Sequence, residues 1–435
     1  MASPPQEGQI LEVEISALAY GGDGIARPDG FTLFIPRTVP GDRVRVEVQT
    51  VRKRYARAVP LEILERSSLR IEPNCRYFDE CGGCHYQNLD PDYVAEQKVT
   101  QIRETLARIG KVEANVLPIV RPDTVWNYRN RLTYHRSPTG ASGYVSWRDY
   151  RIVDVEECPI AQPELNTLWK EVRTATRDIP GNVLPFVVLR KFSTGHLGVI
   201  YSATGTLPSA QLLEPRVASD DSICVTSIKV GARSAFGDTI EVLRGPERLT
   251  ERFGGIDYVV RPDLFFQVHP EVTERVVERV GAWAEEIKPA RVIDLYCGAG
   301  LFTLAFAKRG FPTVGVEVTR ESILCAEESA RVNGLEGTVR FRGGKAERIT
   351  ERLIREGERF DAAVVDPPRK GLPPELIDKL PRLGVTRLLY VSCSPPTLAR
   401  DVAVLSTLGY RLVSVQPFDM FPQTYHVETI STFSR

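Results

Sequence analysis

The sequence predicts an α/β fold, in which a doubly wound parallel sheet follows a small N-terminal β-barrel and a central α+β segment. Two observations predict this arrangement. Residues 8–65 form short stretches of period-two alternation between glycine turns, a pattern typical of a small all-β barrel. From residue 291 onward, apolar runs alternate with helical stripes, the βαβ rhythm of a parallel sheet with helices on its faces.

In the barrel, the clearest strand opens after Gly41, where Val44, Val46 and Val48 alternate with charged residues. Strands are expected at 10–15, 31–35, 43–48 and 56–64. A helix is expected over 92–109, with Gly110 as its stop. Residues 115–255 mix short strands, loops and helices without a clear period.

In the C-terminal part, a helical stripe over 271–287 precedes the alternating elements. Strands are expected at 291–296, 313–318, 338–342, 360–366, 386–393 and 410–416. We therefore divide the chain into domains at 1–66, 67–262 and 263–435.

Composition indicates a globular protein, with 42% hydrophobic and 26% charged residues and a net charge of zero. No apolar run has the length of a membrane span, and the first residues lack a signal-peptide pattern. We expect a cytoplasmic monomer with no membrane partner. Between Arg37 and Arg57, seven basic residues stand against two acidic ones. Such a stripe suits contacts to RNA phosphates, although a solvated surface would look the same.

A glycine turn marks a cofactor site at the end of the first strand of the sheet. Gly298-Ala299-Gly300 lets a ligand approach the backbone, and Glu317 ends the next strand, 19 residues after Gly298. An acid at that distance is placed to accept the two hydroxyls of a ribose. A dinucleotide enzyme would share this pair, whereas Asp366-Pro367-Pro368 at the end of a later strand favours an S-adenosylmethionine (SAM) methyltransferase.

A cysteine ends another strand of the same sheet, at Ser392-Cys393-Ser394-Pro395. Methylation of a pyrimidine at C5 needs a thiolate that adds to C6, because C5 is a poor nucleophile by itself. It then needs a base that removes the C5 proton. We predict Cys393 as the nucleophile, Glu428 as the base and Asp366 as the acid that orients the ring. His426 is a rival base, and a buried, inert thiol is the alternative for Cys393.

Three further cysteines crowd into ten residues, at positions 75, 81 and 84. In a cytoplasmic chain such a cluster favours metal binding or catalysis over disulfides. The spacing does not fit a zinc finger and suits an iron–sulfur cluster, with Cys158 before Pro159 as the fourth ligand. Zinc and reduced structural thiols are the alternatives.

The motifs together resemble the bacterial RNA 5-methyluridine methyltransferase family, most closely its iron–sulfur 23S rRNA branch, over nearly the whole chain. The N-terminal barrel resembles a TRAM domain. The matching motifs are the four cysteines, Phe265-Phe266-Gln267-Val268, Asp294 to Gly300, Asp366 to Arg369, Ser392 to Pro395 and His426-Val427-Glu428.

The resemblance implies a [4Fe-4S] cluster on Cys75, Cys81, Cys84 and Cys158 and a Rossmann-like SAM domain. It implies SAM contacts from Gln267, Tyr296, Gly298, Glu317 and Asp366. The implied partner is RNA, with 23S rRNA first and tRNA as the alternative. Two positions depart from the family: Leu301 stands where asparagine is common, and Lys345 stands where an Asp or Asn often contacts adenine.

The expected reaction extrudes a uridine from its stack and methylates C5 through a covalent adduct of Cys393 with C6. Candidates for base stacking and phosphate contact are Trp126, Tyr128, Arg129 and Arg131, and the two aromatics suit a structural role equally. One rival is an exocyclic-amine methyltransferase, which typically carries an aromatic where Arg369 stands. Another is a non-catalytic iron–sulfur RNA sensor, against which the intact SAM motifs argue.

Overall fold

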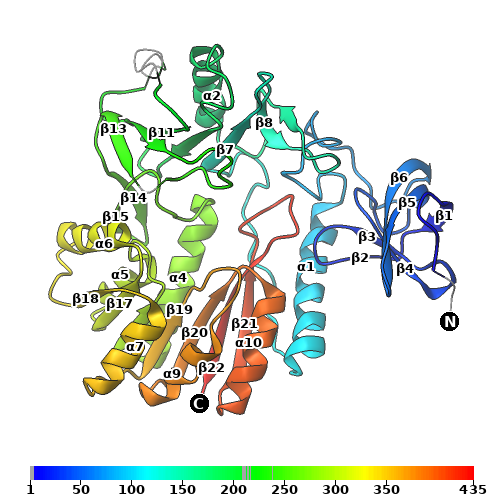
Figure 1. The fold of residues 1–435 in the computed structure, drawn as a ribbon. Helices are drawn as coiled ribbons and strands as arrows, with labels where there is room; N and C mark the ends of the chain where they lie inside the picture. Colours follow the sequence, from blue (N-terminus) through cyan, green and yellow to red (C-terminus); the bar gives the residue numbers. More distant parts are fainter. Residues whose placement is uncertain (1–3, 208–211, 213–214, 216, 238) are drawn as a thin grey trace. The chain divides into compact units, whose positions relative to one another are not determined.

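The computed structural model describes residues 4–207, 212, 215, 217–237 and 239–435, and the chain forms two compact units (Figure 1). The first unit contains Met1–Gln101 and two later segments, Val145–Tyr150 and Phe421–His426. The second unit contains Ile102–Tyr144, Arg151–Met420 and Val427–Arg435. The chain therefore passes between the units several times, and one such passage is the segment Phe421–His426.

The first unit is built on a six-stranded sheet with the order β1-β5-β6-β4-β3-β2. Its strands are β1 (Ile10–Glu14), β2 (Ala17–Leu18), β3 (Gly24–Ala26), β4 (Thr32–Ile35), β5 (Arg43–Val51) and β6 (Tyr55–Glu65), with a short 3₁₀ turn, η1, at Pro28–Gly30. The predicted alternation is confirmed, because Val44, Val46 and Val48 are fully buried in one apolar core. That core draws one face of each long strand inward, as a small barrel requires.

The helix expected over 92–109 is α1 (Pro91–Thr105), followed by a π-helical turn, η2 (Leu106–Gly110). The helical segment ends at Gly110, where the sequence predicted its stop, and the residue that follows in the left-handed conformation is Lys111, with φ +55°. Gly110 has another reason to lack a side chain. A Cβ there would lie 3.2 Å from the carbonyl oxygen of Ala399, on a helix packed against η2.

The middle of the second unit is a seven-stranded sheet with the order β13-β12-β11-β10-β7-β8-β9. Its elements are β7 (Arg131–Arg136), β8 (Ser142–Val145), β9 (Ile152–Asp154), α2 (Pro163–Ala175), β10 (Phe186–Lys191), β11 (Leu197–Ala203), β12 (Ser222–Ser227) and β13 (Ile240–Arg244). The hairpin of β14 (Leu249–Phe253) and β15 (Ile256–Val260) then leads to α4 (Pro270–Ile287), close to the predicted helix.

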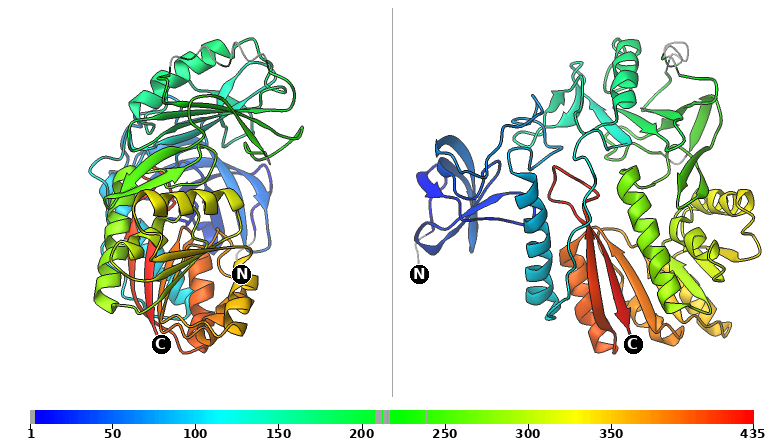
Figure 2. Two further views of the ribbon diagram at one scale, coloured as in Figure 1. Left: turned by 90° about the vertical axis from the view of Figure 1, so that its left-hand side faces the viewer. Right: turned by 180° about the vertical axis from the view of Figure 1, so that it is seen from behind.

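The third sheet carries the predicted βαβ rhythm, in the order β18-β17-β16-β19-β20-β22-β21. Its strands are β16 (Val292–Leu295), β17 (Thr313–Glu317), β18 (Val339–Gly343), β19 (Ala362–Val365), β20 (Arg387–Ser392), β21 (Arg411–Phe418) and β22 (Glu428–Ser434). Its helices are α5 (Leu301–Ala307), α6 (Arg320–Val332), α7 (Ala346–Arg355), α8 (Pro374–Ile377), α9 (Lys379–Arg382) and α10 (Pro395–Thr407). Figures 1 and 2 show α7, α9 and α10 on one face of this sheet and α4 on the other.

The sheet is not wholly parallel, which corrects the sequence-based expectation. Strand β22 was not predicted, and it pairs antiparallel with both β20 and β21. The chain leaves β21 through the connection 419–427 and returns directly, so the two strands form a hairpin that must be antiparallel. None of the described helices combines the length and the apolar character needed to cross a bilayer.

Candidate active site

The candidate residues of the third sheet converge because of its topology. The chain goes from β16 outward to β17 and β18, then returns to β19 on the other side of β16, so the winding reverses between β16 and β19. Ligands of open α/β sheets bind at the carboxyl ends of the strands next to such a reversal. Tyr296, Asp366 and Cys393 directly follow β16, β19 and β20, and Glu317 is the last residue of β17.

The turn after β16 is tightly constrained by its backbone. Tyr296 adopts φ +69°, and Gly298 and Gly300 adopt φ +55° and +92°. The Gly298 N–H donates to Glu317 Oε2 at 3.1 Å, while Glu317 Oε1 accepts the Thr319 N–H at 2.7 Å. The structure thus joins the glycine turn and the strand-end acid. Leu301, the first residue of α5, is buried, in agreement with the expectation that it makes no polar cofactor contact.

A cavity of about 780 Å³ opens beside this turn. Its wall includes two predicted residues, Tyr296 and Glu317, together with Lys345. It also includes Val318 and Glu347, which sequence reasoning missed. Val318 is an apolar side chain that is 62% exposed, so it offers a ligand in the cavity an apolar contact. Burial and then the carboxylate of Glu347 raise the pKa of Tyr296.

Gln267 is held by its backbone. The Asn130 N–H donates to the Val268 carbonyl at 3.0 Å, and the Asn130 side chain donates to the Gln267 carbonyl at 3.4 Å. The Gln267 side chain is 7% exposed. It does not line the cavity beside Tyr296, so the structure does not bring these two predicted cofactor contacts into one pocket.

Two of the predicted RNA contacts have structural roles. Tyr128 is buried and stacks on His269, with ring centroids 4.6 Å apart, so base stacking on Tyr128 is not supported. Arg131 donates to the carbonyls of Leu264 at 2.8 Å and Asp263 at 2.9 Å, and so braces the segment before Gln267. Trp126 is half-buried. Arg129, also half-buried, donates to the Arg131 carbonyl at 2.9 Å.

Glu428 lies beside Cys393 because β22 is antiparallel. The residue pair Ser392–Thr429 ends the register of β20 with β22, and Thr429 Oγ1 donates to the Ser392 carbonyl at 3.0 Å. The next residues outward are Cys393 and Glu428. The first residue of an antiparallel strand thus reaches the edge where the parallel strands end. Glu428 is 5% exposed, and its Oε1 has no hydrogen-bond partner among the described residues.

The electrostatics of this edge confirm that the groups are neighbours. Burial raises the pKa of Cys393 to about 11, with further contributions from the carboxylates of Glu428 and Asp366, against which Arg369 acts. Burial also raises the pKa of Asp366 to about 7. The pKa of Glu428 lies well above its ordinary value, because of burial and then the charge of Asp366. Two buried acids with raised pKa values at one sheet edge are suited to proton transfer with a bound ligand.

Asp294, which sequence reasoning left off the site, also belongs to this electrostatic group. It is fully buried, and Thr303 Oγ1 donates to its Oδ2 at 2.7 Å. Burial raises its pKa to about 7, and the charges of Asp366 and Glu317 contribute. Asp294 therefore interacts electrostatically with Asp366 and with Glu317, which bonds the glycine turn. The sequence signals were its place in a buried strand and at the start of the Asp294–Gly300 motif.

The cysteine segment lies in the first unit and is organised by one arginine. Arg37 donates to the carbonyls of Cys84 at 2.7 Å and Cys81 at 2.6 Å, and its guanidinium stacks 4.0 Å from the ring centroid of Phe78. Cys75 and Cys81 are half-buried and Cys84 is buried, and none of the three forms a disulfide. Cys158 belongs to the second unit, where the Asn166 side chain bonds both its N–H and its carbonyl.

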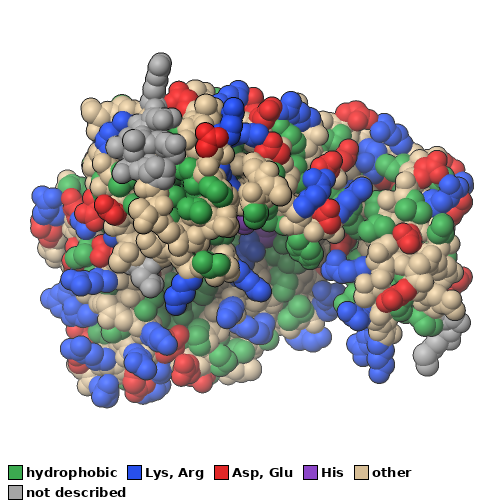
Figure 3. Space-filling model, turned by 45° about the horizontal axis from the view of Figure 1, so that its top comes forward, with side chains coloured by type: hydrophobic (Ala, Val, Ile, Leu, Met, Phe, Trp, Pro, Cys, Tyr) green, Lys and Arg blue, Asp and Glu red, His purple; other side chains and the backbone are tan. Residues whose placement is uncertain are grey.

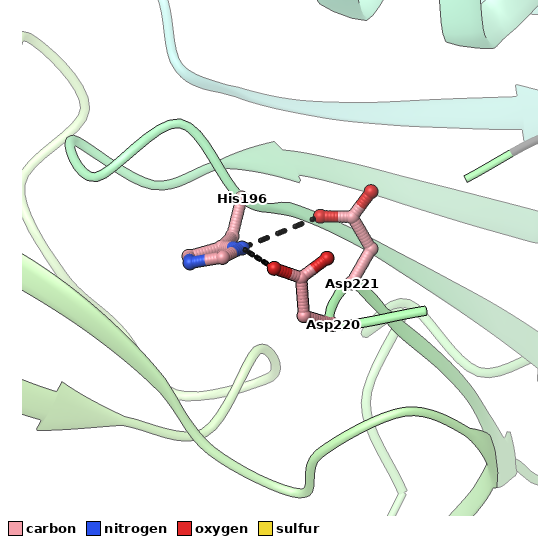
Figure 4. A group of neighbouring side chains, drawn as sticks. All are labelled: His196, Asp220 and Asp221. Carbon is pink, nitrogen blue, oxygen red and sulfur yellow. Dashed lines mark ion pairs between the residues drawn. The ribbon is translucent and has the colours of Figure 1, made fainter. Parts of the chain in front are cut away.

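A separate polar group lies where β10 turns into β11. His196 Nδ1 is 3.6 Å from Asp220 Oδ2 and 3.7 Å from Asp221 Oδ1 (Figure 4). Both oxygens of Asp221 already accept backbone N–H groups, from Leu197 at 2.7 Å and Ala218 at 2.9 Å. The group therefore fastens a turn of the middle sheet, away from the strands that carry Cys393.

Comparison with known proteins decides the family. A sequence model of the tRNA (uracil-5-)-methyltransferase family matches residues 247–435, and one of the TRAM domain matches residues 4–61. An RNA methyltransferase of Halalkalibacterium halodurans is 33% identical over 99% of this chain and 98% of its own length. One of Thermosynechococcus vestitus is 34% identical over 98% of both chains.

The chain belongs to the RNA uracil-5-methyltransferase family. Among solved structures, the Pyrococcus abyssi tRNA (uracil-54, C5)-methyltransferase, in complex with S-adenosyl-L-homocysteine, has a TM-score of 0.77 and 28% identity. The match covers 97% of this chain and all of that one. This uracil-5-methyltransferase is thus a SAM-dependent enzyme with an N-terminal TRAM domain, as the sequence predicted.

Proposed function

We propose that this methyltransferase acts on C5 of one specific uridine through a covalent adduct between Cys393 and C6. The single observation that carries the proposal is the placement of Cys393 beside Glu428 and Asp366, at the sheet edge that also holds the glycine turn and Glu317. A thiol, a protonatable acid and a cofactor site at one edge match the needs of C5 methylation.

The reaction follows from these groups. The Cys393 sulfur, once deprotonated, adds to C6, and the electron pair moves to C5. C5 then takes the methyl group of SAM, which leaves S-adenosylhomocysteine. Glu428 removes the C5 proton, the C5–C6 double bond re-forms, and the bond from C6 to sulfur breaks, so the thiolate returns. Because burial and Asp366 raise the pKa of Glu428, its carboxyl is a stronger base than an exposed glutamate.

For SAM, we propose contacts from Gln267, Tyr296, Gly298, Glu317 and Asp366. Support comes from the bond between Gly298 and Glu317 and from the cavity beside Tyr296. Glu317 would accept the ribose hydroxyls, and removing that acceptor should weaken binding by about 10- to 100-fold. Calorimetric titration of Glu317→Ala with S-adenosylhomocysteine tests this. Unchanged affinity would reject Glu317 as the ribose ligand.

We also propose three domains, namely a barrel of residues 1–66, a central domain of residues 67–262 and a catalytic domain of residues 263–435.

In the central domain we propose a [4Fe-4S] cluster on Cys75, Cys81, Cys84 and Cys158. The donor set suits such a cluster, because cysteine thiolates are the ligands that it takes and Arg37 adds a positive charge beside Cys81 and Cys84. The cluster would brace the loop, since methyl transfer needs no electron. Anaerobically purified protein should be brown with about four irons. A colourless protein with one zinc would contradict the assignment.

For the RNA, we propose 23S rRNA first, on the resemblance of the cysteine pattern. The second candidate is tRNA, favoured by the 28% identity to the P. abyssi enzyme over 97% of this chain. Mass-spectrometric mapping of 5-methyluridine in rRNA and tRNA from a deletion strain decides between them. Loss of one modified uridine from 23S rRNA supports the first candidate, and loss from tRNA alone supports the second. A monomer in the cytoplasm stays a prediction.

A groove of about 960 Å³ in the first unit supports RNA binding. It is lined by the aromatic side chains of Tyr55, Trp147 and Tyr150, with Arg57 and Arg148 among them. Aromatic faces that stack bases and arginines that pair with phosphates are the two parts of a single-stranded RNA site. Elsewhere the charges are mixed. On the face drawn in Figure 3, side chains of both charges are present, with Lys and Arg prominent over its lower half.

A further inference from the structure

The loop Phe421–His426 connects two strands of the catalytic sheet, yet it packs within the first unit. Strand β21 ends at Phe418 and β22 begins at Glu428, and these two residues are paired. Only Val427 separates the loop from Glu428. The backbone that carries the proposed base is thus continuous with a segment whose contacts belong to the barrel, the cysteine segment and α1.

The centre of these contacts is the carbonyl of Gln423. It accepts the N–H of His85 at 2.8 Å and the N–H of Tyr86 at 3.1 Å, directly after Cys84. Gln423 is 7% exposed and adopts φ +66°, a conformation that non-glycine residues rarely take. The left-handed backbone turns this carbonyl toward the cysteine segment, so the bond pair depends on that conformation.

Two further contacts hold the loop. Lys98 of α1, 1% exposed, donates from Nζ to the Phe421 carbonyl at 3.3 Å. The Tyr425 ring meets the rings of His85 and Tyr20 edge to face, with centroids 4.7 Å and 5.5 Å away. The same carbonyl of Phe421 accepts Thr424 Oγ1 at 2.9 Å, which makes the loop a compact turn. The loop is therefore seated as one body on the cysteine segment.

Glu428 itself has few constraints of its own. Its Oε1 makes no hydrogen bond among the described residues, so its carboxyl is placed by backbone and packing. Pairing with Phe418 fixes one side of its backbone, and the seated loop fixes the other. We propose that the Cys84–Tyr86 segment positions Glu428 for removal of the C5 proton, through Gln423 and the loop that follows it. This rests on the proposed function, in which Glu428 is the base.

The test distinguishes a positioning role from a general effect on folding by asking which step of the reaction becomes slower. A displaced Glu428 leaves addition of Cys393 and methyl transfer in place and retards only the release of the adduct. In Gln423→Val, a β-branched side chain disfavours the left-handed conformation, so the loop should leave its seat. Gln423→Gly accepts that conformation and should rescue release. Lys98→Met removes one clamp and should give a smaller effect.

Each variant is mixed with RNA and SAM, and the covalent enzyme–RNA species is followed on denaturing gels beside total methylated RNA. We expect adduct release to slow by about 10- to 100-fold in Gln423→Val, because misplacing a reacting group by about an ångström has that effect. Release is measured at saturating RNA, because Tyr425 of the loop and His85 also line the groove of the first unit and RNA affinity can change with them. Hydrogen exchange over 421–426 should rise in the same variant.

Other results would overturn the inference. If Gln423→Val releases product at the wild-type rate, the clamp does not position the base, whether or not hydrogen exchange rises. If Gln423→Val slows addition and release equally, the loop acts on the whole fold. Glu428→Gln is the reference: if it accumulates no adduct, the base assignment itself fails. An adduct with Glu428→Gln but none with Gln423→Val rejects the positioning role alone.

Discussion

At the scale of single residues, the Cys393 thiol has a higher pKa than a cysteine in solution. Burial and two carboxylates keep the Cys393 thiol protonated in the free enzyme, with a pKa of about 11. At pH 7 only about one thiol in ten thousand is then ionised, against a few per cent for an ordinary cysteine. The Cys393 thiol is therefore weakly nucleophilic until bound substrate changes its surroundings.

The low thiolate fraction of Cys393 can be measured by alkylation. We expect iodoacetamide to label Cys393 at a rate that rises about tenfold per pH unit between pH 7 and 9, because only the thiolate reacts. Peptide mass spectrometry distinguishes Cys393 from the other thiols. A rate that begins to level off at about pH 8.5 would show an ordinary thiol instead.

The raised pKa of Asp366 makes the stability of the fold depend on pH. Its pKa is about 7 in the folded protein and about 4 when unfolded, so between these values the folded state binds more protons. The free energy of unfolding must then fall as pH rises through this window. Asp366→Asn, which cannot ionise, should stabilise the protein at pH 8 by on the order of 2 to 4 kcal/mol while it impairs methylation.

The control lies at the other end of the same strand. The Asp361 carboxylate accepts the N–H groups of Ala290 and Arg291, each at 2.8 Å. Asp361→Asn should therefore lower the free energy of unfolding, by about 1 to 2 kcal/mol. Denaturant melts at pH 5 and pH 8 measure both variants. A destabilised Asp366→Asn at pH 8 would show that its carboxylate is satisfied in the fold.

At the scale of elements, Asp42 joins the barrel to the segment that follows it. Its buried carboxylate accepts the N–H groups of Val39 at 2.8 Å and Ser67 at 3.0 Å, and Arg70 at 2.5 Å. Asp42→Ala leaves a nearly buried arginine unpaired and should destabilise by about 3 kcal/mol.

The matched variant is Glu12→Ala, which removes an exposed partner of Arg45 and should change the free energy of unfolding by less than about 1 kcal/mol. Hydrogen exchange of residues 10–65 should rise in Asp42→Ala alone. Equal effects in the two variants would mean that Asp42 is no more than a surface ion pair.

The sequence predicted the strands that carry a local hydrophobic pattern. It did not predict features that depend on pairing between distant segments. Period-two alternation placed β5, and apolar runs placed β16 to β20, because burial on both faces leaves a clear pattern. Strand β22 has no such run, because Thr and Ser separate its apolar residues, and it was missed, although its antiparallel direction brings Glu428 to Cys393. The contact of Gln423 with His85 joins residues far apart in sequence, and no local pattern predicts it.

At the scale of the whole molecule, the groove of the first unit should contribute to RNA affinity. Tyr150 is 84% exposed in the groove wall, a position in which a large aromatic gains little from the fold itself. Tyr150→Ala should weaken RNA binding by about 5- to 100-fold, because a stacked base is lost.

Tyr150→Phe keeps the ring and should bind RNA nearly as wild type does. Affinity for S-adenosylhomocysteine should be unchanged in both variants, since the proposed SAM residues belong to other elements. Filter binding at fixed salt measures the RNA. Equal loss in the Phe and Ala variants would show that the hydroxyl, and not stacking, carries the contact.

The central claim is that Cys393 and Glu428 form and resolve one covalent adduct with uridine. The most direct measurement is tryptic mass spectrometry of Glu428→Gln after reaction with RNA and SAM. The account predicts a trapped species in which the Cys393 peptide carries a methylated uridine nucleotide, absent from Cys393→Ala. A Glu428→Gln enzyme that turns over without an adduct, or an adduct on another residue, would contradict it.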